Sequence, residues 1–575
     1  MINLKAKPFY LSDKDIEWVE KTKNSLTLDE KIGQLFMDML WNNTAEEIES
    51  RINAYGMSGF RYTNLSPEKL YEQNATAQKA CKVPALIAAN VESGGNGAVA
   101  GGTYIGDPVA IGASHNDENA YYMGYMGCKE AAAVGCNWTF APIVDINRNW
   151  RNCVISNRSF GSDADMVLRM GKEYLRGATD AGVACCMKHF PGDGMDERDQ
   201  HIVTTINDMS CEEWDATFGK VYKGMIDAGV QSVMIGHIQM PEYSRRLRPG
   251  IADKDIMPAT ISKELLTDLL REQLGFNGLI ITDATHMVGL TSKMKRGEFV
   301  PYCIECGCDL VLYYRDKDED TAAMKAGLES GLLSKERFDD ALTRVLAMKA
   351  MLKLHEKQAA GTLMPPKENL SIIGCSEHIK KQAEVYDESI TLVKNTANQL
   401  PLTPETHKRI MLYSLDSLSD AMRQMMGGGS KSPEDIMKEE LEAAGFAVTT
   451  FNIRTDVNGK QLLASTPVQE FVSKFDAVVI IANISGFSQS NERRLHWSMP
   501  MGPDIPWYVT EMPTVFVSVN NPFHLIDVPM VPTYINAYNG TPAAIHAVVE
   551  KIVGKSTFKG ESTVDAFCGA WDTHI

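Results

Sequence analysis

The chain has 575 residues, 44% hydrophobic and 23% charged, a globular composition that exceeds one ordinary core and predicts two domains. Its formal net charge of −17 argues against nucleic acid or an anionic membrane surface as the main partner, because both select a basic surface. The first residues lack the apolar core of a signal peptide, and no apolar run approaches the roughly 18 residues of a membrane span. We therefore expect a cytoplasmic protein whose 12 cysteines are reduced.

Short apolar runs alternate with amphipathic helical stretches over the first 350 residues. The runs lie at 33–39, 57–63, 84–90, 137–146, 184–190, 231–238, 278–284 and 309–314. Alternating strands and helices predict a parallel sheet, and eight units fit a (β/α)8 TIM-like barrel over residues 1–355. An open doubly wound sheet is the alternative, but the Gly-rich phosphate loop typical of that fold is not found after the first run.

A Pro- and Gly-containing stretch follows the last barrel helix and predicts a linker over residues 356–385. Beyond it, six apolar runs alternate with helical segments and predict a smaller α/β layered-sheet domain over 386–575. The runs are ESITLVKN, KRIMLYSL, GFAVTTFNI, FDAVVIIANI, PTVFVSVN and VPTYINAYNG. MMGGGS (425–430) lacks the Lys and Ser/Thr of a Walker loop, so we interpret it as a turn.

Cys303, Cys306 and Cys308 form a C-x-x-C-x-C cluster, which could hold a metal ion. No second pair lies at zinc spacing, and the segment continues directly into the buried run DLVLYY. We interpret the three cysteines as small apolar residues that pack in the core, and we predict no metal site.

Polar side chains follow several of the predicted barrel strands. Because the C-terminal strand ends of such a barrel form its active site, these side chains are expected to converge. Asp145 ends the fourth run. The candidate binding residues near these ends are Asn90, Arg158, Lys188, His189 and His237.

Asp283 ends the seventh run, in GLIITDATHM. A carboxylate at the mouth of a buried strand is partly dry and conformationally restricted, which suits a nucleophile. An Asp that caps the following helix is an equally good interpretation of the spacing alone.

Asp199 and His201 lie two residues apart on the loop that begins with PGDG, which is a candidate mobile lid. A carboxylate bonded to one imidazole nitrogen orients the ring and makes the other nitrogen a better base. A chance Asp-x-His on a surface loop is the alternative.

KHFPGDG followed by DQH resembles the KHFPGHG…DSH signature of family 3 glycoside hydrolases, in their two-domain β-N-acetylglucosaminidase branch. NRSFGSD is similar to the Arg-containing loop of that family, and LIITDA to the segment that carries its nucleophile. The C-terminal runs also resemble the two-domain members, so the resemblance covers nearly the whole chain.

The resemblance implies a retaining mechanism in which Asp283 is the nucleophile and His201 the general acid and base, with Asp199 as its partner. It places Asn90, Arg158, Lys188 and His189 around the hydroxyl groups of the sugar. No metal or organic cofactor is implied.

This sequence departs from the family pattern at several places. Asp193 stands at the second His of PGHG, and Asn90 stands at the Asp of a DQEGG-like pattern. The family's Arg-bearing stretch after EGG is absent, since the chain reads ESGGNGAVAGG. A muropeptide substrate is therefore expected less than a plain N-acetylglucosaminide.

We predict an exo-acting retaining β-N-acetylglucosaminidase that hydrolyses terminal N-acetylglucosamine through a glycosyl-aspartate. The alternatives are a β-N-acetylglucosaminide phosphorylase with the same dyad, a non-catalytic sugar-binding protein, and a β-glucosidase of the wider family. The expected partner is a sugar or oligosaccharide, and a homodimer is left open. SNERRLHW (490–497), with Arg493 and Arg494, is either a contact of the second domain or a solvated loop.

Overall fold

The computed structural model describes residues 2–417, 431–450, 467–484, 488–489, 494–497 and 504–575. These residues form two compact units, each described by itself below. The first consists of 1–105, 120–148 and 163–379, and the second of 106–119, 149–162 and 380–575. The segments 106–119 and 149–162 thus group with the C-terminal part of the chain, whereas the sequence predicted one uninterrupted domain over 1–355. MMGGGS (425–430) and Arg493 lie outside the described residues.

The first unit is built on an eight-stranded parallel sheet, in the order β10-β1-β2-β3-β4-β5-β7-β9. A parallel bridge between Ile281 and Leu310 joins the two outer strands and nearly closes a barrel, which confirms the predicted fold class. The strands are β1 (Phe36–Leu40), β2 (Gly59–Tyr62), β3 (Leu86–Ala89), β4 (Trp138–Thr139), β5 (Ala184–Phe190), β7 (Ser232–Ile235), β9 (Leu279–Thr282) and β10 (Val311–Leu312). Each of the eight predicted runs overlaps one of them.

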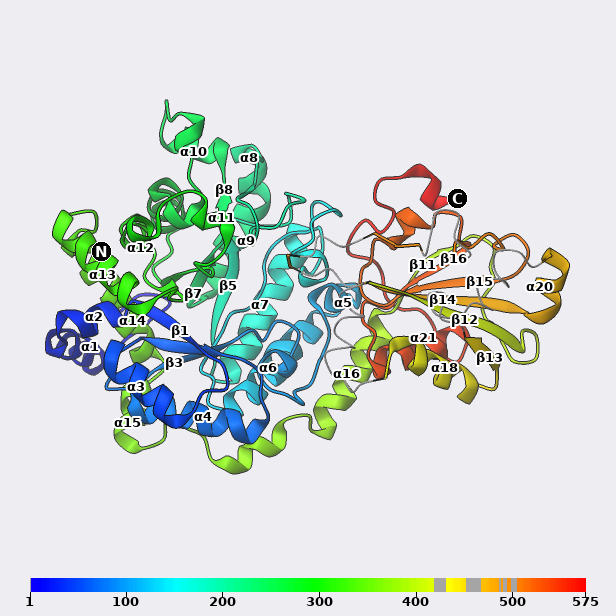
Figure 1. The fold of residues 1–575 in the computed structure, drawn as a ribbon, viewed down its shortest axis with the longest axis horizontal. Helices are drawn as coiled ribbons and strands as arrows, with labels where there is room; N and C mark the ends of the chain where they lie inside the picture. The colour runs from blue at the N-terminus through cyan, green and yellow to red at the C-terminus, as the bar shows by residue number, and fades with distance from the viewer. Residues whose placement is uncertain (1, 418–430, 451–466, 485–487, 490–493, 498–503) are drawn as a thin grey trace. The chain divides into compact units, whose positions relative to one another are not determined.

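Helices surround these strands (Figure 1). They include α3 (Ala45–Tyr55), α4 (Pro67–Ala80), α6 (Asp117–Ala133), α7 (Ala164–Asp180), α9 (Lys220–Ala228), α12 (Arg296–Cys306), α13 (Lys317–Ser330) and α14 (Lys335–Met351). The predicted linker 356–385 is largely helical, because it holds most of α15 (Leu354–Ala360) and the start of α16 (Ser376–Ser389). No helix among the described residues is long and apolar enough to cross a membrane.

The unit β1–α3–β2 shows how local sequence sets the helix boundaries. Thr44 and Glu47 form a reciprocal capping box at the start of α3, which satisfies backbone donors that have no partner within the helix. Gly56 ends the helix at φ 57°, a left-handed conformation that glycine adopts without strain. The chain then enters β2 beside β1, with Met37 paired to Gly59.

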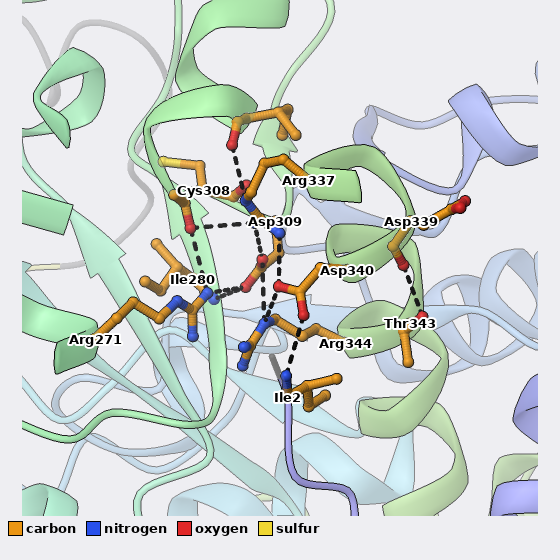
Figure 2. A network of polar contacts seen from close by, with 12 residues as sticks. Ile2, Arg271, Ile280, Cys308, Asp309, Arg337, Asp339, Asp340, Thr343 and Arg344 are labelled. Carbon is orange, nitrogen blue, oxygen red and sulfur yellow. Dashed lines mark hydrogen bonds and ion pairs between the residues drawn. The ribbon is translucent and has the colours of Figure 1, made fainter. Parts of the chain in front are cut away.

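A buried ionic network lies near the N-terminal ends of β9 and β10, at the end of the barrel opposite to Asp283 (Figure 2). Asp309 is fully buried and accepts hydrogen bonds from Arg271 Nη2 at 2.6 Å, from the Ile280 amide at 2.7 Å and from Arg337. Asp340 accepts from Arg337 and from Arg344, each at 2.8 Å. The network joins β9 and β10 to α14 and to the helix Glu264–Gln273.

Replacing Asp309 with Asn is expected to destabilise the protein by about 3–5 kcal/mol, because it leaves buried guanidinium groups without their carboxylate. Chemical denaturation of the full chain measures this loss. Asp227→Asn, which removes an exposed helical ion pair to Lys223, is the matched control and should change stability far less. Equal effects of the two substitutions would contradict a structural role for the network.

The second unit contains a six-stranded mixed sheet, in the order β11-β16-β15-β14-β12-β13, with β11 antiparallel to its neighbour. The strands are β11 (Thr391–Asn395), β12 (Arg409–Asp416), β13 (Ala447–Thr450), β14 (Ala477–Asn483), β15 (Thr514–Ser518) and β16 (Thr533–Asn536). Each of the six predicted runs therefore overlaps one of these strands in its described residues.

Apolar residues cover both faces of this sheet. Val479 and Ile481 of β14 pack in one core with α18 (Pro433–Ala443) and α21 (Pro542–Ile552). Val478 and Ile480, which alternate with them, pack in another core with Phe471 of α20 (Val468–Lys474). A strand that is buried on both faces has a continuous apolar sequence, which explains the run AVVIIAN.

Candidate active site

Asp283 follows β9 directly, so its position is fixed by the sheet. Its amide donates to Ile235 O of β7 at 2.9 Å, and its Oδ1 accepts from the next amide, Ala284, at 2.7 Å. Burial acts to raise the pKa of Asp283, but the imidazoles of His189 and His237, the Ala284 amide and His201 together hold that pKa below its usual value. Asp283 is therefore ionised at neutral pH and available as a nucleophile.

Asp199 and His201 form the predicted hydrogen-bonded pair. Asp199 is fully buried, and its Oδ1 lies 2.6 Å from His201 Nδ1 and accepts from the His201 amide at 2.8 Å. The His201 side chain keeps 27% of its surface exposed. When Nδ1–H donates to Asp199, the carboxylate orients the ring and makes Nε2 the more basic nitrogen.

The loop that carries this pair packs against the segment after Asp283. The Val288 amide, at the start of α11 (Val288–Thr291), donates to His201 O at 3.0 Å. The amide of Gly289 donates to Gln200 O at 3.2 Å. His201 is close enough to Asp283 for its charge to lower the pKa of that carboxyl. The structure thus brings the predicted nucleophile and the predicted acid–base pair into one site.

Lys188 and His189, at the end of β5, are both buried and both paired. Lys188 Nζ donates to Glu92 Oε1 at 2.6 Å, which gives the buried ammonium its counter-charge. His189 Nδ1 lies 2.7 Å from Asp145 Oδ2, and the His189 amide donates to the same carboxylate. These pairs tie β5 to the segments that follow β4 and β3.

His237 follows β7 and is fully buried beside Asp283. Its Nδ1 lies 2.8 Å from Thr260 Oγ1, and its Nε2 lies 3.2 Å from Ala284 O. Burial lowers the pKa of His237, while the nearby Asp283 carboxylate acts to raise it. Because both ring nitrogens contact protein atoms, this geometry suits support of the Asp283 segment better than direct contact with a sugar.

Asn90 lies at the end of β3, opposite β9 in the barrel, and contacts a residue that sequence reasoning missed. Arg61 of β2 donates from Nε to Asn90 Oδ1 at 3.4 Å. The pKa of Tyr313 is raised, mainly because the phenol is buried. The Arg61 guanidinium acts to lower that pKa and the Asp283 carboxylate to raise it, so the phenol lies near both charges. Arg61 and Tyr313 therefore join the candidate site from the ends of β2 and β10.

Arg158 lies in the second unit, in the short 3-10 helix Ser156–Arg158. Its Nη1 donates to Val154 O at 3.2 Å within that unit. Arg494 of the same unit binds Asp527, and its guanidinium lies 5.7 Å from the ring centroid of Trp150. The roles of Arg158 and Arg494 toward a sugar stay predictions.

Cys303, Cys306 and Cys308 are all buried in the first unit. Burial raises the pKa of Cys303 to about 12 and that of the other two thiols further. Protonated thiols are poor metal ligands, so the surroundings of this cluster favour its interpretation as apolar residues that pack in the core.

Comparison with known proteins gives a consistent set of relatives. The model of the glycosyl hydrolase family 3 N-terminal domain matches residues 27–348. A Cellulomonas fimi protein named β-N-acetylglucosaminidase/β-glucosidase is 40% identical over 575 residues, all of both chains. The structure of a β-glucoside phosphorylase, also solved with 2FGlc, aligns with a TM-score of 0.92 at 38% identity over 99% of each chain. A family 3 β-N-acetylglucosaminidase from Paenibacillus sp. str. FPU-7 aligns with a TM-score of 0.76 at 26% identity, over 94% of this chain and 99% of its own.

Proposed function

Because the chain belongs to glycoside hydrolase family 3, we propose that it is a retaining exo-β-N-acetylglucosaminidase that acts through a glycosyl-aspartate. The observation that carries the proposal is the dyad beside Asp283: His201 held at 2.6 Å by buried Asp199, next to an ionised carboxylate. The relatives named as β-hexosaminidases, from Pseudoalteromonas piscicida and Hydrogenovibrio crunogenus among others, support the choice of sugar.

In the first step, the Asp283 carboxylate attacks the anomeric carbon while His201 Nε2 gives its proton to the departing oxygen. The bond between the anomeric carbon and the aglycone breaks, and an ester to Asp283 forms. Asp199 holds the imidazole in the tautomer that presents Nε2 and stabilises the imidazolium before proton transfer.

In the second step, His201 Nε2 takes a proton from an incoming water, whose oxygen attacks the anomeric carbon and displaces Asp283. Two displacements at one carbon return the original configuration, so the released sugar is the β-anomer. Lys188, His189, Asn90 and Arg61 lie around the site at the ends of β5, β3 and β2, and we assign to them the binding of the sugar hydroxyls.

A second candidate function is phosphorolysis, in which phosphate replaces water in the second step. Two observations favour it: the β-glucoside phosphorylase structure aligns over 99% of both chains, and the base is an imidazole. A neutral imidazole does not repel an approaching phosphate, whereas a carboxylate base would.

Assaying an aryl β-N-acetylglucosaminide with and without inorganic phosphate separates these candidates. Hydrolysis predicts free N-acetylglucosamine at a rate that phosphate does not change. Phosphorolysis predicts N-acetylglucosamine-1-phosphate and a faster release of the aryl group when phosphate is present. Absence of aryl release under both conditions, with aryl β-glucosides also inert, would contradict both and favour a sugar-binding protein.

A further inference from the structure

Gln200 lies between the two members of the dyad, and its side chain is fully buried. Its Oε1 accepts the amide hydrogen of His237 at 2.7 Å, at the end of β7. Its Nε2 donates to Asp193 Oδ2 at 3.2 Å, within the PGDG turn. The buried amide of Gln200 therefore both accepts and donates a hydrogen bond, and it holds the end of β7 and the PGDG turn in place relative to each other.

Asp193 connects Gln200 to Asp145. It is 3% exposed, and its Oδ1 accepts from the Gly194 amide at 2.7 Å. Its own amide donates to Asp145 Oδ1 at 2.8 Å, the same carboxylate that holds His189. Gln200 and Asp193 together therefore link the dyad loop to the ends of β5 and β7 and to Asp145 in the segment after β4.

The packing around Gln200 leaves little room for the loop to shift. A Cβ atom added at Gly289 would lie 2.5 Å from Gln200 O and 2.9 Å from Val203 O. A Cβ atom added at Gly236 would lie 3.1 Å from Gln200 Oε1. The close approach of Gly289 to the Gln200 backbone and of Gly236 to the Gln200 side chain agrees with a loop that is held in place.

The two residues also stand where this sequence differs from the signature that it resembles. Asp193 replaces the second His of PGHG, and Gln200 replaces the Ser of the D-S-H motif. The two changes lie in direct hydrogen-bond contact, with Gln200 as donor and Asp193 as acceptor. Loss of the Gln200 amide would remove this donor from the buried Asp193 carboxylate.

We propose that Gln200 and Asp193 are a coupled pair of positioning residues that holds the Asp199–His201 dyad in its working place beside Asp283. The inference rests on the proposed function for its catalytic consequence, but the structural coupling can be measured without any substrate. Neither side chain is assigned a contact with the sugar.

A double-mutant cycle tests the pair with Gln200→Ser, Asp193→His and the double variant. Each single variant should lower kcat/KM for a glycoside with a poor leaving group about 10- to 100-fold, because a displaced acid protonates that group poorly. A substrate with an activated aryl leaving group should lose much less. The double variant should recover part of the loss.

Hydrogen–deuterium exchange of the full chain provides the second readout. The segment 192–203 should exchange faster in each single variant and return toward the wild-type rate in the double variant. Gln78→Ser is the matched control, since Gln78 is also buried and bonds Ala85 through both amide atoms, far along the chain from the dyad. It should change neither readout.

Two results would overturn the inference. One is unchanged exchange of 192–203 in both single variants. The other is multiplicative effects of the two substitutions on kcat/KM, which would mean that the residues act independently. An inert wild-type enzyme with coupled exchange effects would instead count against the proposed function and leave the positioning pair supported.

Discussion

Asp283→Asn should lower kcat by roughly four orders of magnitude or more, the scale of loss when a catalytic nucleophile is removed. The amide keeps the shape of the carboxyl group and can still accept from the Ala284 amide, so the fold should be unaffected. Initial rates with an activated aryl glycoside measure the loss, and thermal unfolding verifies the fold. Asp227→Asn, on the exposed face of α9, is the control and should retain full activity.

Added azide sharpens this test. A small anion can occupy the space of the lost carboxylate oxygen and attack the anomeric carbon directly. We expect azide to restore part of the aryl release from Asp283→Asn and to give the α-glycosyl azide, because only one displacement then takes place. Substantial activity of the variant without azide would rule out Asp283 as the nucleophile.

His201→Ala should lower kcat/KM for glycosides with poor leaving groups by about 10²- to 10⁴-fold, the usual contribution of general acid catalysis. An activated aryl group leaves without a proton, so kcat/KM for such a substrate should change little. The slope of log kcat/KM against leaving-group pKa, measured over a series of aryl glycosides, should therefore become steeper. A parallel loss for all leaving groups would show that His201 is not the acid.

Sequence reasoning succeeded where one local pattern determines the structure. The run LIIT is a buried strand, so the Asp283 that follows it had to lie at a barrel mouth. Asp199 and His201 are two residues apart, and their contact needs no long-range information. The motifs KHFPGDG and LIITDA led to family 3 glycoside hydrolases, and this family assignment is confirmed.

The sequence alone did not predict contacts between residues that lie far apart in the chain. Lys188 meets Glu92 across 96 positions of the chain, and no periodicity links the two. Arg61 lies in the middle of a strand pattern, and its contact with Asn90 depends on the pairing of β2 with β3. The grouping of 149–162, and with it Arg158, with the C-terminal unit depends on contacts between segments that are hundreds of residues apart.

Trapping the intermediate is the most direct test that Asp283 and His201 work on one sugar. A β-N-acetylglucosaminide that carries fluorine at C5 and a good leaving group reacts slowly and should accumulate as an ester of the enzyme. Peptide mapping by mass spectrometry should find the added sugar on the peptide that contains Asp283, with slower release of that sugar in His201→Ala. A sugar attached to a different carboxylate, or no attached sugar while the substrate is turned over, would contradict the account.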